Sequence, residues 1–437
     1  MNDHEKNRVI IGTLKTESQS LENIRCEVHL NSHDTSRMKA DIYDLDGTTA
    51  FRFMKDFMGK HVVFQSSTDN EEITFQGTVS SGQISDSSDR IGSVRIDNYQ
   101  QNFYLNRDPL VTASLVYYLA PIEMFKRTRM RCFHDMRGLL FGYDDWTNEE
   151  KPIWNDESHS YPTNVGELVF YPGLLFEENE RGNVTVVDQS KVTVSLKSEN
   201  IDLDNARAAI ENMLSAYLHI VSFLENRFIA WFRCDIDARS TNGKGMVATI
   251  YRRTPKWEYS GNQYIERHAE GYRGLVPKLV ERYVALDHQK KLELDKAIKQ
   301  LLVAAKPDQP IDTELIYWHS CLDILLKALS GDKASDRKYM GFSRKLVLAC
   351  EEANIEWSDL YTDVSREDIF SDNLRADLRI TTIRNNMIHH GDYPNIDEFD
   401  EVIAENNRAA ALAERMILHM LGIDYRNSPV GKFRNFR

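Results

Sequence analysis

Near the end of the chain, one short stretch combines the residue types that cleavage of a phosphodiester needs. In the sequence RNNMIHHG, Arg384 and Asn385 are followed after three residues by His389, with His390 directly behind it. An imidazole has a pKa near ~6.5 and exchanges protons at the pH of a cell, and a guanidinium holds phosphate oxygens in a fork. Together with the Asn385 amide, these groups could activate a ribose 2′-hydroxyl and stabilise the charge that builds on phosphorus.

A helix must carry this stretch. Ile380, Ile383 and Met387 recur at helical spacing and predict one buried face. Gly391 is suited to end the helix, because glycine takes the left-handed backbone of a C-terminal cap. On an ideal helix, residues five apart lie roughly 140° apart around the axis. We therefore expect the arginine and the first histidine to meet only if the helix ends or distorts between them, or if a second copy of the chain completes the site.

The stretch resembles the signature of HEPN-domain ribonucleases, in which an arginine is followed after four to six residues by a histidine, commonly with a polar residue behind the arginine. The resemblance implies a metal-independent endoribonuclease site, without a cofactor, at a homodimer interface. It gives Arg384, Asn385 and His389 the catalytic roles. His390 also lies within the family spacing, so either histidine can be the working base. A second match, from Arg129 to His134, has no asparagine behind its arginine and no clear helix end.

A second segment narrows the resemblance. ELIYWHSCLDILLKAL, at 314–329, stands some 60 residues before RNNMIHHG, as in the ApeA-type branch of bacterial anti-phage defence proteins. The match covers about 311–422, and the order of a largely β region before a helical domain is also that of this branch. It implies RNA as the substrate, a role in abortive infection and a phage-derived trigger. Asp323 lies where relatives often carry an acid, and together with His390 it is expected to help bind the substrate. It could orient Arg384 or His389, or it could be a solvated or capping carboxylate.

The composition is that of a globular protein of two or three domains. The chain has 437 residues, of which 41% are hydrophobic and 28% charged. It has no apolar run long enough to span a membrane and no signal core, and its five cysteines are scattered, so we expect a cytoplasmic location. The net charge of −13 counts against a broad surface for nucleic acid. A basic run at 126–137 and the basic, aromatic tail at 426–437 are local candidates for holding RNA, although the tail could equally be solvated.

The layout predicts an α+β protein in three parts. Residues 1–200 read as a β-rich N-terminal domain, a sensor or substrate selector; 201–310 as a helical connecting region; and 311–437 as a HEPN-like helical bundle. Six segments over 8–97 and three over 167–197 show strand patterns, and 206–228 has helical periodicity. We predict one helix over 275–305 and a second that begins with Asp312 as its N-cap. A third helix covers 336–355. A fourth runs from the capping box of Ser365 and Asp368 to Arg384, and a fifth begins at the capping box of Asn395 and Glu398.

Two alternatives stand beside the ribonuclease. In the first, the helical domain is a non-catalytic module that binds a partner protein or a nucleotide, and the Arg/His pair serves only as a helix cap. In the second, His389, His390 and Asp392 hold a metal, but adjacent histidines seldom reach one ion from a helix, so no metal is expected. Phosphate-binding loops, nucleophile elbows and dinucleotide fingerprints are absent from the sequence, which removes support for ATPase, α/β-hydrolase and dehydrogenase functions.

Overall fold

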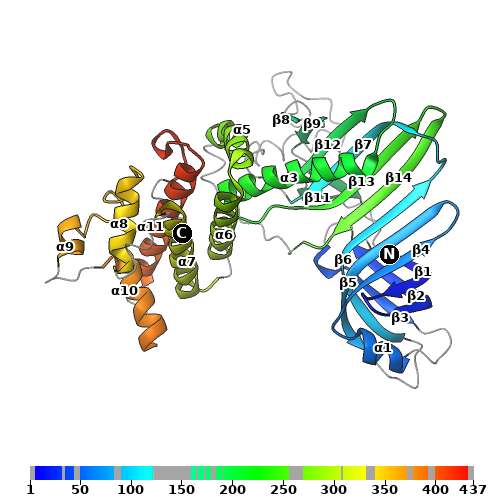
Figure 1. Ribbon diagram of the computed structural model, residues 1–437, viewed down its shortest axis with the longest axis horizontal. Coiled ribbons are helices and arrows are strands. Elements are labelled where there is room, and N and C mark those ends of the chain that lie inside the picture. Colours follow the sequence, from blue (N-terminus) through cyan, green and yellow to red (C-terminus); the bar gives the residue numbers. More distant parts are fainter. Residues whose placement is uncertain are drawn as a thin grey trace. The chain divides into compact units, whose positions relative to one another are not determined.

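The structure is a computed structural model of the chain (Figure 1). It describes residues 5–31, 35–43, 50–82, 90–120, 122, 159–163, 166–171, 174–178, 184–188, 190–254, 269–306, 309–330, 340–371, 377–391 and 399–431. The chain divides into two compact units. The first holds most residues up to 215 together with 229–258, and the second holds 216–228 and the residues from 259 onward.

The first unit is built on one antiparallel sheet of twelve strands (Figure 1). Its strands are β1 (Glu5–Lys15), β2 (Ser20–Asn31), β3 (Lys39–Tyr43), β4 (His61–Ser67), β5 (Glu71–Gly82), β6 (Arg90–Tyr104), β7 (Leu110–Leu119), β8 (His159–Thr163), β9 (Gly166–Tyr171), β12 (Ser190–Lys197), β13 (Trp231–Ser240) and β14 (Gly243–Arg252). β10 (Leu174–Glu178) and β11 (Val184–Asp188) form a separate hairpin. Each of the nine segments with a strand pattern before residue 200 contains a strand, and the segment 167–176 contains two, β9 and β10.

The first six strands close into a barrel. Their order is β3-β2-β1-β4-β5-β6, and β3 also pairs with β6. Successive side chains of a strand point to opposite faces, and apolar side chains from all six strands fill the interior with Phe53 and Phe57 of α1 (Ala50–Phe57). β6 pairs with β3 through its first half and with β14 through its second half. This long strand therefore joins the barrel to the rest of the sheet.

The sheet continues beyond residue 200, in the region expected as a helical connection. Within that region the segment MVATIYRR, 246–253, has the pattern of a strand or hairpin arm, and β14 confirms this prediction. β14 pairs with β6 and β13 pairs with β7, so the hairpin 231–252 fills the space between two strands that follow one another in sequence. The expected helical region 201–310 is therefore helical only on either side of this hairpin. Its helices are α3 (Leu203–Glu225), α5 (Ala269–Ala285) and α6 (His288–Ala304).

The second unit is helical. It contains the C-terminal part of α3, then α5, α6, α7 (Ile311–Ser330), α8 (Phe342–Glu352), α9 (Arg366–Phe370), α10 (Arg379–Asn385), a π-helical turn (Asn386–His390) and α11 (Phe399–Met420). α7 is the central helix of this unit, because it contacts α6, α8, α10 and α11 (Figure 1). Helical spacing predicts a buried side made of Leu315, Trp318, Leu322, Leu325 and Leu329; the first four are buried, and Leu329 is half-buried. The chain is thus an α+β protein with a β-rich N-terminal region and a helical C-terminal part.

Several helix boundaries differ from the prediction. The helix expected over 336–355 is α8, which begins after its N-cap Gly341 and ends at Glu352. The single helix expected over 275–305 is two helices, because Asp287 caps α6 by accepting a hydrogen bond from the N–H of Lys290 and so starts a new helix. The capping box of Ser365 and Asp368 is present, but it starts the short α9 and not the helix that carries Arg384. Asp312, expected as an N-cap, lies inside the first turn of α7.

Several predicted features lie outside the described residues: the basic run 126–137 with the second Arg/His match, the proposed cap at Asn395 and Glu398, and tail residues 432–437. Among the helices that the structure does describe, none combines the length and the apolar character needed to cross a bilayer.

Candidate functional site

The motif lies on α10 and the π-helical turn that follows it. Ile380, Ile383 and Met387 are all buried, which confirms the predicted apolar face. The start of α10 is fixed to the first turn of α8 by Ser343, whose hydroxyl accepts a hydrogen bond from the N–H of Leu378 at 3.0 Å and lies 3.1 Å from the Thr381 hydroxyl. Packing and hydrogen bonds therefore set the position of the exposed side of α10 relative to α8.

After Asn385 the helix changes its hydrogen-bonding pattern. Residues 386–390 form a π-helical turn, and the N–H of Gly391 donates to the carbonyl of Asn386, five residues earlier. Gly391 has φ 70° and ends the turn in the left-handed region, so its predicted role as the helix terminator is confirmed. π-Helical turns are rare and are frequent at functional sites.

This turn brings the motif residues together within one chain. A bond pattern of i to i+5 places a residue roughly above the one five positions earlier, and Arg384 and His389 are five apart. Nη1 of Arg384 donates to Oδ1 of Asn385 at 2.9 Å and lies 3.5 Å from Nε2 of His389. Of the three arrangements that the sequence allowed, a distorted helix is the one found. A second copy is not required for the pair to meet.

The guanidinium of Arg384 keeps hydrogen-bond donors for an anion. Within the described part of the chain, no carboxylate forms an ion pair with it. Arg384 and Asn385 are partly buried, and His389 is exposed. Neighbouring residues therefore restrict the first two side chains, and solvent reaches the histidine. A partly desolvated guanidinium with no paired acid is suited to bind a phosphate.

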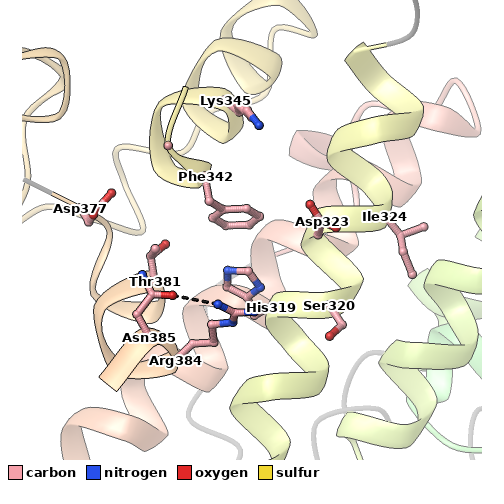
Figure 2. A pocket seen from close by; sticks show the side chains of 11 residues that line it. His319, Ser320, Asp323, Ile324, Phe342, Lys345, Asp377, Thr381, Arg384 and Asn385 are labelled. Carbon is pink, nitrogen blue, oxygen red and sulfur yellow. Dashed lines mark hydrogen bonds between the residues drawn. The ribbon is translucent and has the colours of Figure 1, made fainter. Parts of the chain in front are cut away.

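Arg384 and Asn385 also line a cavity of about 540 Å³. Its other walls include His319 and Asp323 from α7 and Phe342 and Lys345 from α8 (Figure 2). In Figure 2 the Arg384 side chain extends toward the His319 imidazole. The motif therefore does not face a sealed core; it stands at a hollow between three helices of the second unit.

His319 is a member of the site that the motif did not reveal. Its imidazole stacks on Phe342 with ring centroids 4.1 Å apart. Burial and then the nearby charge of Arg384 lower the pKa of His319 to about 4, while Asp323 acts in the opposite direction. The imidazole is therefore neutral at pH 7. A signal was present in the sequence, since His319 precedes Asp323 by four residues and so shares one side of the same helix.

The remaining predicted site residues are placed less closely. Asp323 lines the cavity, but its carboxylate pairs with Lys327 on the next turn at 2.6 Å, and no bond joins it to Arg384 or His389. His390 is exposed at the end of the π-helical turn. Among the residues that the structure describes, no three histidine, cysteine, aspartate or glutamate side chains are grouped so that they could hold a metal ion.

Comparison with known proteins adds no relative: no family model matches the chain, no curated protein matches it, and no solved structure matches it. The interpretation of the site therefore depends on its residues and their geometry.

The neutral His319 predicts a pH-dependent stability. In the unfolded chain a histidine takes up a proton near pH 6.5, whereas folded His319 does so only near pH 4. Between these values the unfolded state binds more protons, so stability falls as the pH is lowered through this window, by at most about 3 kcal/mol. Urea unfolding of both proteins at pH 7 and pH 4.5 checks this. The free energy of unfolding should fall less between these pH values in His319→Gln than in the wild type. An equal difference between the two proteins at both pH values would contradict the assignment.

Proposed function

We propose that the protein is a metal-independent endoribonuclease whose site is formed by Arg384, Asn385 and His389. The observation that carries the proposal is the juxtaposition of Arg384, which forms no ion pair with a described carboxylate and lines a cavity, and the His389 imidazole 3.5 Å away. An anion-binding group and a proton-transfer group side by side are the two functions that cleavage of RNA by its own 2′-hydroxyl demands. The helical unit would then be a HEPN-type bundle of the ApeA-like branch.

In the proposed reaction, His389 removes the proton from the ribose 2′-hydroxyl. A neutral imidazole has one ring nitrogen that can accept this proton, and Nε2 of His389 lies 3.5 Å from Nη1 of Arg384, next to the phosphate that Arg384 would bind. The 2′-oxygen attacks phosphorus, the bond to the 5′-oxygen breaks, and that oxygen takes up a proton from water to leave as a 5′-hydroxyl. Arg384 binds the phosphate oxygens as negative charge grows on them, and Asn385 holds the guanidinium in place through its 2.9 Å hydrogen bond. His390 is the alternative base.

The competing function is a non-catalytic module that binds a protein or a nucleotide. A purely structural Arg/His pair is expected to have its polar atoms satisfied by the fold, either inside a packed bundle or as a cap on the last carbonyls of the helix. Here His389 is exposed and Arg384 borders a cavity, which supports the enzymatic proposal.

The deciding experiment is incubation of purified protein with total cellular RNA and excess EDTA. Cleavage is expected to continue in EDTA and to leave a cyclic phosphate and a 5′-hydroxyl, because attack by the 2′-hydroxyl gives these ends. End-group mapping reads the products. Ends with a 5′-phosphate, or a reaction that EDTA stops, would contradict the proposed mechanism.

The protein is further expected to act as a homodimer. The resemblance to HEPN ribonucleases implies that two motifs face each other across a two-fold axis, and an isologous contact would place both copies of 384–391 together. Since the π-helical turn already brings the pair together in one chain, the dimer would combine two sites. Sedimentation of the active protein should show a dimer; a monomer under conditions where RNA is cut would rule this out.

The proposal assigns regulation to the β-rich unit. A ribonuclease that stops growth must be held inactive until it is needed, and loops on a rigid sheet are a common platform for recognition. We place this activity in the cytoplasm, in anti-phage defence, with a phage-derived trigger. Growth arrest that occurs equally with and without infection would contradict the trigger.

A further inference from the structure

We propose that the cavity bounded by His319, Phe342, Lys345 and Arg384 is a nucleotide subsite, which seats the base next to the phosphate that Arg384 binds. The inference rests on the proposed ribonuclease function and extends it, because it makes cleavage depend on the identity of one base.

The cavity has the size and position for a nucleotide. Its volume of about 540 Å³ lies within the range of small-ligand pockets, roughly 300–1,000 Å³. Arg384 and Asn385 stand on its wall, so a chain whose phosphate is held by the guanidinium can place an adjacent base in the hollow (Figure 2). The ligand therefore needs no path through the core of the unit.

One wall offers an aromatic surface. The Phe342 and His319 rings stack at 4.1 Å with 29° between their planes, and both side chains remain partly exposed. A base that stacks on an aromatic side chain gains roughly 1–3 kcal/mol. His319 is neutral at pH 7 because its pKa is lowered to about 4, so its imidazole offers one donor and one acceptor and can meet the edge of a base.

The entrance carries positive charge for phosphate. Lys345 lines the cavity, and no described carboxylate forms an ion pair with it. Gly341 and Phe342, at the start of α8, also line the cavity, and the N–H groups of this first turn form the positive end of the helix.

Two carboxylates also line the cavity, and they do not prevent this use. Asp323 is paired with Lys327 at 2.6 Å, and Asp377 is exposed to solvent. A carboxylate oxygen accepts hydrogen bonds from the N–H groups of a base. These charges favour one orientation of the nucleotide: its phosphate lies at Arg384 and Lys345, and its base points toward Asp323.

The direct test is calorimetric titration of the full-length protein with each of the nucleoside monophosphates AMP, GMP, CMP and UMP. The wild type should bind at least one, and Phe342→Leu should weaken that binding by at least about tenfold through lost stacking. Phe370→Leu is the matched control, because Phe370 is a partly exposed phenylalanine of α9 that packs under Arg366 and does not line the cavity. If Phe342→Leu does not fold, Lys345→Gln replaces it and should weaken binding several-fold.

Cleavage mapping separates this inference from the proposed function. Wild-type cuts should share one base at a fixed position beside the scissile phosphate, and Phe342→Leu should relax that preference. RNA cleavage without such a preference, and without binding of any monophosphate, would overturn the subsite and leave the ribonuclease standing. Monophosphate binding that depends on Phe342, in a protein that cuts no RNA, would support the subsite and remove the proposed function.

Discussion

Arg384→Ala is expected to reduce RNA cleavage by at least about 100-fold, the size of the loss when one preorganised donor to a developing oxyanion is removed. Arg384→Lys should recover only part of the rate, because an ammonium is a point charge and cannot hold two phosphate oxygens in a fork. The fold should survive, since the side chain is partly exposed and forms no ion pair with a described carboxylate. Single-turnover cleavage of a defined RNA and a melting curve measure the two effects.

Arg379→Ala is the matched control for this substitution. Arg379 lies on the same helix and pairs with Glu401 at 2.9 Å, away from the cavity lining. Its replacement should leave the cleavage rate within about twofold, because exposed ion pairs contribute little. Equal losses in the two variants would show that charge on α10, and not the motif, supports the reaction.

The two histidines can be separated in the same assay. His389→Ala should abolish cleavage and His390→Ala should not, because only His389 has a ring nitrogen beside the guanidinium of Arg384. If the reverse is found, His390 is the base and the 3.5 Å contact is structural. If neither variant loses activity, the site has been placed wrongly.

Arg415→Met is expected to give the largest loss of stability, about 2–4 kcal/mol, because it breaks a buried charged network. The Arg415 side chain is only 4% exposed, and its guanidinium binds both carboxylate oxygens of Asp359, at 2.6 and 2.7 Å. It also donates to the carbonyls of Glu356 and Gly431, which lose their partner in the variant. Because more than half of the Asp359 side chain is exposed, most of the cost comes from these carbonyls. Urea unfolding at pH 7 measures it.

Arg426→Met provides the comparison for Arg415. Arg426 lies over the ring of Tyr425, as Arg415 does, but it is about half exposed and pairs with an equally exposed Asp424. Its replacement should cost less than about 1 kcal/mol. Similar losses for the two variants would mean that stacking on Tyr425, and not the buried network, stabilises this end of the unit.

Local patterns in the sequence were sufficient for much of the fold. The alternating strands before residue 200, the buried side of α7 and the apolar side of α10 follow from periodicities that each segment carries by itself. Gly391 could be recognised because a left-handed cap demands a particular residue. The break at Asp287 was missed, although an aspartate that accepts from the N–H three residues later is a helix start.

Features that depend on distant neighbours could not be read in this way. The π-helical turn depends on which carbonyl the N–H of Gly391 reaches, and the position of His319 beside Phe342 depends on how α7 and α8 pack. The closure of β3 on β6 and the insertion of the hairpin 231–252 are pairings between segments far apart in sequence. The motif could therefore be found from its letters, but the cavity beside it could not.

The inserted hairpin also sets the order in which the protein can be completed during synthesis. The second half of β6 and the whole of β7 leave the ribosome early, yet the strands that pair with their facing edges end only at Arg252. At a synthesis rate of roughly 5–20 residues per second, the interval from the end of β7 to the end of β14 lasts roughly 7–27 s. During it, two strand edges offer unpaired N–H and C=O groups to any neighbouring chain. A growing polypeptide that forms β6 and β7 before Arg252 has emerged would therefore expose both edges until β13 and β14 pair with them.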